Sequence, residues 1–181
     1  MKNEEYVFPQ YMPGEELKEI RKSLSMTQKQ FALFTGVSTP TIERLERQDK
    51  ASGPIVILAE ILRRNRGLPD KMTLPEKSGN IRLKYSYKSM LCTVIDVNVP
   101  QRKVQIKNYI DNPMFRAFGV NTEPTYEDYE AFLESRCFPR ERDKIKLELD
   151  RLGIPFYEPL LIIEKTKGRM SEDDFSITIE R

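Results

Sequence analysis

The sequence predicts an all-α domain of four to five short helices, followed by a linker and a small α+β domain. Three observations support this prediction. Apolar residues in 14–66 recur at helical spacing between glycine and proline breakers. Residues 67–88 combine prolines, glycines and lysines, as linkers do, and β-branched runs dominate from residue 89 onward. The 181 residues leave room for two small domains.

Four helices are predicted in the first half, at about 15–24, 28–34, 39–48 and 54–67. The first follows Pro13 and Gly14, and Gly36 ends the second. Ser38 is expected to cap the third, and Gly53 with Pro54 opens the fourth. Residues 14–66 therefore form one helical domain, preceded by an N-terminal arm over 1–13.

Residues 67–88 form a basic linker whose last part alternates between apolar and polar side chains. The apolar positions are Ile81, Leu83, Tyr85 and Tyr87, and the polar ones are Arg82, Lys84 and Ser86. This alternation predicts a strand. It would also suit a basic edge strand lying along a phosphate backbone, but the plain strand is favoured.

Residues 89–181 predict a small α+β domain. A hairpin is expected from the β-branched runs 90–99 and 104–110, with residues 100–103 as its turn. Helices are expected over 125–135, capped by Thr125, and over 140–152, stopped by Gly153. Residues 160–165 are too short to assign as helix or strand. A turn over 171–174 leads into a last strand over 175–179.

Composition argues against most enzyme classes. Histidine is absent, which removes the usual general base, the usual zinc ligand and the histidine-activated nucleophiles. Two cysteines, Cys92 and Cys137, form neither a metal-ligand spacing nor a disulfide framework. We therefore expect no enzyme activity, no metal and no cofactor. Carboxylate catalysis by Asp96 or Asp173 is the weakest of the hypotheses.

The charge is distributed unevenly although the net charge is only +2. Residues 14–66 carry ten Lys and Arg against seven Asp and Glu, and residues 67–88 carry five against two. Residues 89–181 carry fourteen against seventeen. A basic first half favours a nucleic-acid partner. The acidic start without an apolar core, and the lack of a run of about 20 apolar residues, predict a cytoplasmic protein with no membrane partner.

Residues 27–46 contain the most informative pattern in the chain. Thr27 is placed to cap one helix, Ala32 allows close helix crossing, and Gly36 permits a tight turn. The next helix begins after Ser38 and leaves one face outside. That face carries Thr39, Pro40, Thr41 and Arg44. A helix presented in this way fits the DNA major groove.

This stretch resembles the XRE (lambda-repressor-like) helix-turn-helix family, whose usual form is TQxxLAxxxGVSxxTIxxxE. The resemblance covers 14–66 and implies a dimeric regulator, expected to be a repressor, on a palindromic operator in double-stranded DNA. It implies that Gln28 binds phosphate and braces a base contact, and that Thr41 contacts the backbone. The candidate DNA-binding residues are Thr27, Gln28, Lys29, Ser38, Thr39, Pro40, Thr41, Arg44 and Arg47.

The chain departs from the family pattern at two places. Pro40 can offer only an apolar contact to a base, and Arg47-Gln48 replaces the common Asn-Gly. Arg44 is the best candidate for a bidentate contact to guanine. Three alternatives remain: the unit has become a protein-interaction module, Gln28 only caps its helix, or Arg44 only pairs with Glu43 or Asp49.

Two further resemblances suggest an antitoxin-like or accessory protein as the alternative function. The segment Ser52-Gly53-Pro54, with Leu58 and Leu62, resembles antitoxins of the HigA/MqsA type. Segments 93–96, 132–142 and 171–177 resemble a small domain associated with HipA-like kinases. That likeness implies that residues 89–181 bind a partner enzyme, if they do not dimerise the protein or sense a signal.

Three arginines in this region, Arg136, Arg140 and Arg142, are a candidate anion- or partner-binding cluster. The competing interpretation, which we favour, pairs them with the nearby carboxylates of Glu134, Glu141 and Asp143 on a solvated surface. Tyr126, Tyr129 and Phe132 are expected to lie in the core.

Overall fold

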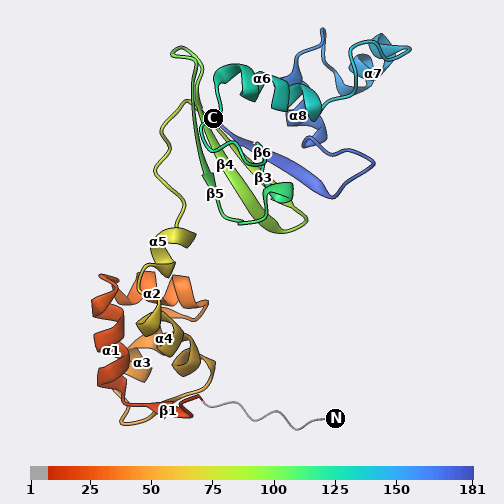
Figure 1. Cartoon of the computed structure of the whole chain (residues 1–181). Coiled ribbons are helices and arrows are strands. Elements are labelled where there is room, and N and C mark those ends of the chain that lie inside the picture. The colour runs from red at the N-terminus through yellow and green to blue at the C-terminus, as the bar shows by residue number, and fades with distance from the viewer. Residues whose placement is uncertain (1–7) are drawn as a thin grey trace, which may run out of the picture. The chain divides into compact units, whose positions relative to one another are not determined.

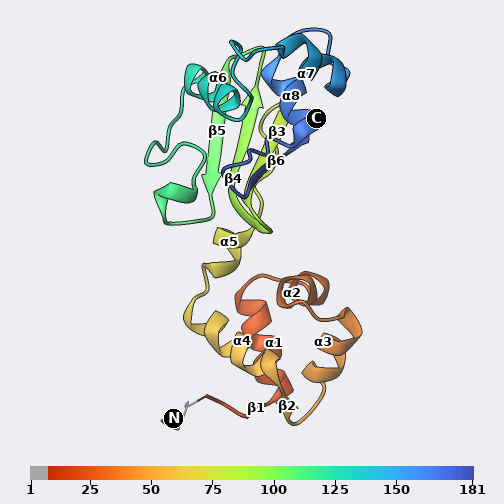
Figure 2. The ribbon, with the colours of Figure 1, turned by 90° about the vertical axis from the view of Figure 1, so that its right-hand side faces the viewer.

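The computed structural model describes residues 8–181 and divides the chain into two compact units, Met1–Thr73 and Leu74–Arg181. Figures 1 and 2 show the elements of each unit from two sides. Residues 1–7, which make up half of the expected N-terminal arm, lie outside the described part of the chain.

The first unit contains the four predicted helices: α1 (Gly14–Ser23), α2 (Gln28–Thr35), α3 (Thr39–Glu46) and α4 (Pro54–Arg64). Their apolar faces meet in one core, in which Leu17, Phe31, Ile42 and Leu62 are completely buried. The ends of α3 and α4 fall two to three residues before the expected ends at Gln48 and Gly67. The spacing of apolar residues therefore predicts the helices correctly and their last turns less well.

Part of the expected arm belongs to the first unit. Strand β1 (Tyr11–Met12) pairs antiparallel with β2 (Ala51–Ser52), and the Met12 side chain is buried in the helical core. Gly14 follows directly and lies against the end of α3. Its N–H donates to the carbonyl oxygen of Gln48 at 3.0 Å, and a Cβ at this position would lie 2.4 Å from the carbonyl oxygen of Leu45.

The linker expected over 67–88 differs from the structure at both ends. A short helix, α5 (Leu68–Met72), extends the first unit, with Leu68 packed against the helical core and Pro69 buried in the first helical turn. At the other end, β3 (Ile81–Tyr87) is a strand of the second unit. Only residues 74–80 precede this strand in the second unit.

The second unit is built on a four-stranded antiparallel sheet with the order β5-β4-β3-β6. The strands β4 (Met90–Asn98) and β5 (Lys103–Asn108) form the predicted hairpin, and β6 (Phe175–Glu180) pairs with β3. Strand β3 therefore has a neighbour on both sides. The alternative in which it forms a basic edge strand along a phosphate backbone is wrong, because both of its edges are already paired.

Helices cover one face of this sheet, as Figures 1 and 2 show. Helix α6 (Tyr126–Ser135) begins at the predicted Thr125 cap, and α8 (Pro159–Thr166) shows that residues 160–165 are helical. Leu83 and Ile95 of the sheet, Phe132 of α6, and Ile162 and Ile163 of α8 share one core. A short 3-10 helix (Pro113–Phe115) lies between β5 and α6.

Helix α7 (Ile145–Leu152) is shorter than the helix predicted over 140–152. Residues 140–144 are all charged, so they have no apolar side chain to pack against the core. They form turns, and Lys144 has a positive φ of 60°, which interrupts a regular helix. The helix begins where Ile145, Leu149 and Leu152 supply an apolar face.

Candidate nucleic-acid interface

The first helix of the candidate interface, α2, starts with a complete capping box. The Thr27 side chain accepts a hydrogen bond from the N–H of Gln30 at 3.2 Å, and the Gln30 side chain accepts one from the N–H of Thr27 at 2.8 Å. The next residues, Gln28 and Lys29, open the helix, and Lys29 is exposed to solvent. The start of α2 thus combines the positive end of a helix dipole with a solvated cation, which suits a phosphate group.

A tight turn leads from α2 into α3. Gly36 has a φ of 72°, which a residue with a Cβ rarely adopts, so the predicted role of this glycine is confirmed. Ser38 then caps α3 by accepting a hydrogen bond from the N–H of Thr41 at 3.3 Å. The hydroxyl groups of Ser38 and Thr41 also lie 2.8 Å apart, so both are positioned at the start of α3.

A buried network holds α1, α2 and α3 together behind this turn. Arg21 of α1 donates to both carboxylate oxygens of Glu46 in α3, at 2.6 and 3.0 Å, and Gln28 of α2 donates to Glu46 at 2.8 Å. A third donor of Arg21 reaches the carbonyl oxygen of Met26 at 2.9 Å. Gln28 is therefore more than a helix cap, because it braces the helix that the resemblance assigns to base reading.

The Glu46 carboxylate is stabilised in its charged form by this network. Burial acts to raise the pKa of Glu46, but the hydrogen bonds from Arg21 and Gln28 outweigh it and leave the pKa lowered. The Arg21–Glu46 pair is almost completely buried, so the free-energy cost of its desolvation must be offset by short, well-aligned hydrogen bonds such as these. The orientation of α3 relative to α1 and α2 is thus fixed by an ion pair with a defined direction.

The opposite face of α3 presents the predicted reading residues to solvent. Pro40 and Arg44 are exposed, whereas Thr39 and Thr41 are half-buried. Within residues 8–181, Arg44 forms no ion pair, so the proposed pairing with Glu43 or Asp49 is not present there. The guanidinium of Arg44 is free to contact a base edge.

A groove of about 280 Å³ lies beside α3 and contains residues that the sequence analysis did not assign to DNA contact. Thr41 and Arg44 line one part of it, and Ser52 and Pro54 line another, where α4 begins. The sequence could have indicated this part of the groove, because Gly53-Pro54 marks the start of a helix, where backbone N–H groups have no partner within the helix. Ser52 is therefore a further candidate for contact with the DNA backbone.

The three candidate arginines, Arg136, Arg140 and Arg142, do not share one anion-binding surface. Arg136 is buried, and it donates to the carbonyl oxygen of Gly168 and to the carboxylate of Asp173 at 2.6 Å. Arg140 pairs with Glu134 at 2.7 Å, as the competing interpretation expects, and Arg142 lies 3.9 Å from Glu148. Each arginine is engaged by a different partner.

The two carboxylates considered for catalysis, Asp96 and Asp173, have structural partners. Asp96 accepts two hydrogen bonds of 2.6 Å from Arg82 on the neighbouring strand, and Asp173 accepts one from the N–H of Phe175 in the predicted turn before β6. Burial raises the pKa of the Cys137 thiol to about 12, which disfavours a thiolate. Across residues 8–181, no three Cys, Asp or Glu side chains come together as a metal site would require.

Comparison with known proteins bears on the first unit only. Residues 17–60 match the family model described as Helix-turn-helix. No curated protein and no solved structure matches the chain. No helix within residues 8–181 has the length and apolar character needed to cross a membrane. The match, the glycine turn and the exposed face of α3 show together that residues 17–60 form a DNA-binding helix-turn-helix domain of the XRE type.

Proposed function

We propose that this protein is a sequence-specific transcriptional repressor that binds a palindromic operator as a dimer. The observation that carries the proposal is the contrast between the two faces of α3. The inner face is held by the buried Arg21–Glu46–Gln28 network, and the outer face presents Arg44, which forms no ion pair within residues 8–181. A rigid helix with a free guanidinium is what base recognition in the major groove requires.

The contacts follow from the position of each side chain. Arg44 donates two hydrogen bonds to a guanine, Thr39 contacts a neighbouring base, and Pro40 packs against a thymine methyl group. Lys29, Arg47 and the start of α2 at Thr27 bind phosphates. Two such units on one duplex place their half-sites about 34 Å apart, which is one turn of DNA.

Selection of DNA from a random pool by the full-length protein tests this proposal. The expected result is a short site with two-fold symmetry and half-site centres about 10 base pairs apart. A pool that shows no enrichment, at a salt concentration where non-specific binding is retained, would contradict sequence-specific recognition. An enriched site without symmetry would contradict the dimer alone.

Arg44→Ala tests the assigned reading residue on the selected operator. We expect loss of about 1–3 kcal/mol of discrimination between operator and unrelated DNA, with weak salt-sensitive binding retained. Arg151→Ala is a matched control, because Arg151 is an exposed arginine of the second unit that already pairs with Glu148 at 3.3 Å. Gel-shift titrations compare both variants. Unchanged operator preference in Arg44→Ala would show that another residue reads the sequence.

We also propose that the second unit acts through binding and not through catalysis. Its compact separate fold and its structurally engaged carboxylates support this proposal. A partner enzyme of the HipA-like kinase type, with the first unit repressing a shared operon in the manner of an antitoxin, is the second candidate. It rests on the sequence resemblance of segments 93–96, 132–142 and 171–177. Co-purification of the full-length protein with such a kinase would support it.

A further inference from the structure

The second unit contains a cavity of about 670 Å³, and all of its lining residues belong to this unit. The cavity lies where the start of β3, one face of α6 and the start of α8 come together. Ile81, Leu133 and Leu160 provide apolar lining, one residue from each of these elements. Its volume is in the range of small-molecule binding sites, and its lining combines apolar side chains with polar and charged ones.

One of these polar groups is the hydroxyl of Tyr129. The Tyr129 side chain is only 3% exposed, and within residues 8–181 its hydroxyl forms no hydrogen bond. The groups whose charges act on this hydroxyl are Tyr126, Glu158 and Glu130, and all three line the cavity. Within residues 8–181 no fully buried polar side-chain atom lacks a partner, so this hydroxyl reaches the surface of the cavity, where water or a bound molecule can complete its hydrogen bonds.

The charges around the cavity favour a positively charged ligand. Three glutamates line it, Glu130, Glu134 and Glu158, against one arginine, Arg140. Arg140 is already engaged, because it pairs with Glu134 at 2.7 Å and lies over the ring of Tyr157 at 4.6 Å. Glu158 forms no ion pair with any residue between 8 and 181.

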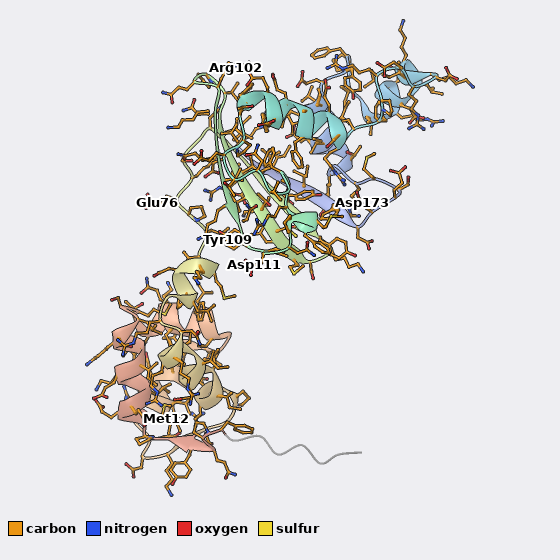
Figure 3. All side chains as sticks on the ribbon, in the orientation of Figure 1. Met12, Glu76, Arg102, Tyr109, Asp111 and Asp173 are labelled. Atoms are coloured by element: carbon orange, nitrogen blue, oxygen red, sulfur yellow. The ribbon has the colours of Figure 1, made fainter. Side chains whose placement is uncertain are left out.

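A second arginine, Arg102, lies outside the lining at the tip of the β4–β5 hairpin, beside α6 (Figure 3). It pairs mainly with Glu127 at 2.8 Å and covers the ring of Tyr126 at 4.1 Å, whereas Glu130 is 3.4 Å away. Arg102 therefore neutralises part of the charge of Glu130, and Glu158 is the lining carboxylate that has no ion pair within residues 8–181. Arg102 also shows that the aromatic face of Tyr126 accepts a cation.

An anion is the less suitable ligand, although α8 begins at the cavity. The N-terminus of a helix attracts anions through its free N–H groups. At this helix, however, Glu158 occupies the N-cap position and Pro159 lacks an N–H group. The carboxylate of Glu158 would repel a bound anion.

We propose that this cavity binds an organic cation with an aliphatic chain, of the straight-chain diamine class. An ammonium group is held by the carboxylates of Glu130 and Glu158 and donates a hydrogen bond to the hydroxyl of Tyr129. The methylene chain packs on Ile81, Leu133 and Leu160. The proposal does not depend on DNA binding, because every residue in it belongs to the second unit and the ligand is detected directly.

Calorimetric titration of the full-length protein with 1,5-diaminopentane tests the proposal. Two probes of the same chain length, 1,5-pentanediol and glutarate, separate the charge from the chain. We expect binding of the diamine only, and weaker binding as salt is added, because exposed carboxylates are screened. Absence of a diamine signal at millimolar concentration would overturn the proposal, and so would stronger binding of glutarate.

Two variants assign the binding to this cavity. Glu158→Gln removes a charged acceptor and is expected to weaken diamine binding about tenfold. Tyr129→Phe removes the hydroxyl and is expected to weaken it several-fold, with circular dichroism checking that the fold is retained. Glu172→Gln is the matched control, since Glu172 is exposed and lies outside the cavity lining. Equal affinity in Glu158→Gln and Glu172→Gln would place the binding elsewhere and overturn the proposal.

Discussion

Most exposed arginines of the second unit are paired with a glutamate, whereas those on α3 and at its C-cap are not. In the second unit, exposed arginines on the hairpin, around α7 and at the end of β6 each lie within 4 Å of a glutamate; these are Arg102, Arg140, Arg142, Arg151 and Arg181. In the first unit, Arg44 and Arg47 are exposed, and neither forms an ion pair with any of residues 8–181. These five arginines of the second unit are each paired with a glutamate, whereas Arg44 and Arg47 keep their charge available for contacts with phosphates and bases.

The position of each arginine in the fold, and not only the number of charged residues in each unit, explains this difference. The first unit also contains paired arginines, because Arg63 and Arg64 at the end of α4 both donate to Glu60. Within residues 8–181, the arginines of the first unit that form no ion pair are Arg44 of α3, Arg47 at its C-cap and Arg66 beyond the end of α4. A net charge counted over the domain would not distinguish these two helices, but DNA binding depends on the distinction.

Each unit also has a buried arginine–carboxylate pair, with a different structural task. Arg21 and Glu46 are 25 residues apart and join two helices, whereas Arg82 and Asp96 join the neighbouring strands β3 and β4. The first pair orients the DNA-facing helix, and the second stabilises strand register. Removing one partner from each pair should therefore have different functional results.

The largest effect is expected for Glu46→Ala. The substitution leaves Arg21 buried without its counter-charge, which costs about 3–5 kcal/mol in the free energy of unfolding of the first unit. Chemical denaturation monitored by circular dichroism measures the loss, and Asp49→Ala is an exposed acidic control on the same unit. Asp96→Ala is the counterpart in the second unit and should spare operator binding. If both substitutions destabilise the chain but neither affects operator binding, the two pairs do not differ in task.

A smaller effect on stability is expected when the pH is lowered. The folded-state pKa of Glu46 is lowered, so its contribution to stability is complete above the ordinary glutamate value of about 4.3 and is lost as the pH falls through the lower folded value. Arg21 stays charged throughout this range. The temperature of thermal unfolding, measured between pH 7 and 2.5, should therefore decrease less steeply below pH 4.5 for Glu46→Gln than for the unchanged chain. Parallel curves would show that the network contributes no acid sensitivity.

The smallest effect is expected at the edge of the interface. Arg47→Ala removes one proposed phosphate contact, so the slope of log affinity against log salt should decrease by about 1, with operator preference unchanged. Arg151→Ala removes an exposed arginine that is already paired, and it should leave the slope unchanged. Titrations at several salt concentrations measure both slopes. Equal slopes for the two variants would mean that unpaired arginines have no special role.

Local signals in the sequence were sufficient for the DNA-facing elements. Capping by Thr27 and Ser38, and the turn at Gly36, depend on residues within a few positions of each other. The pairing of β1 with β2 could not be predicted in this way. Two-residue strands have no periodicity, and their partners are about 40 residues apart.

Long-range partners explain the remaining differences. The burial of Arg136 depends on Asp173 and Gly168, which are 37 and 32 residues further along the chain. The cavity around Tyr129 likewise combines β3, α6 and α8, so helical spacing indicated that Tyr129 is buried but not that its hydroxyl reaches the surface of a cavity. The prediction of a helix from residue 140 was wrong at its start. Charged residues have acceptable helix propensity, but residues 140–144 have no apolar side chains that pack against the core.

The β1–β2 pairing has a practical consequence for dissecting the molecule. A recombinant fragment cut at the sequence-predicted limits, 14 and 66, would lack β1, the buried Met12 side chain and the packing of Leu68. Its β2 strand would lose its partner immediately after the DNA-facing helix. A fragment that retains residues 8–73 keeps these contacts and is the appropriate unit for isolating the DNA-binding half.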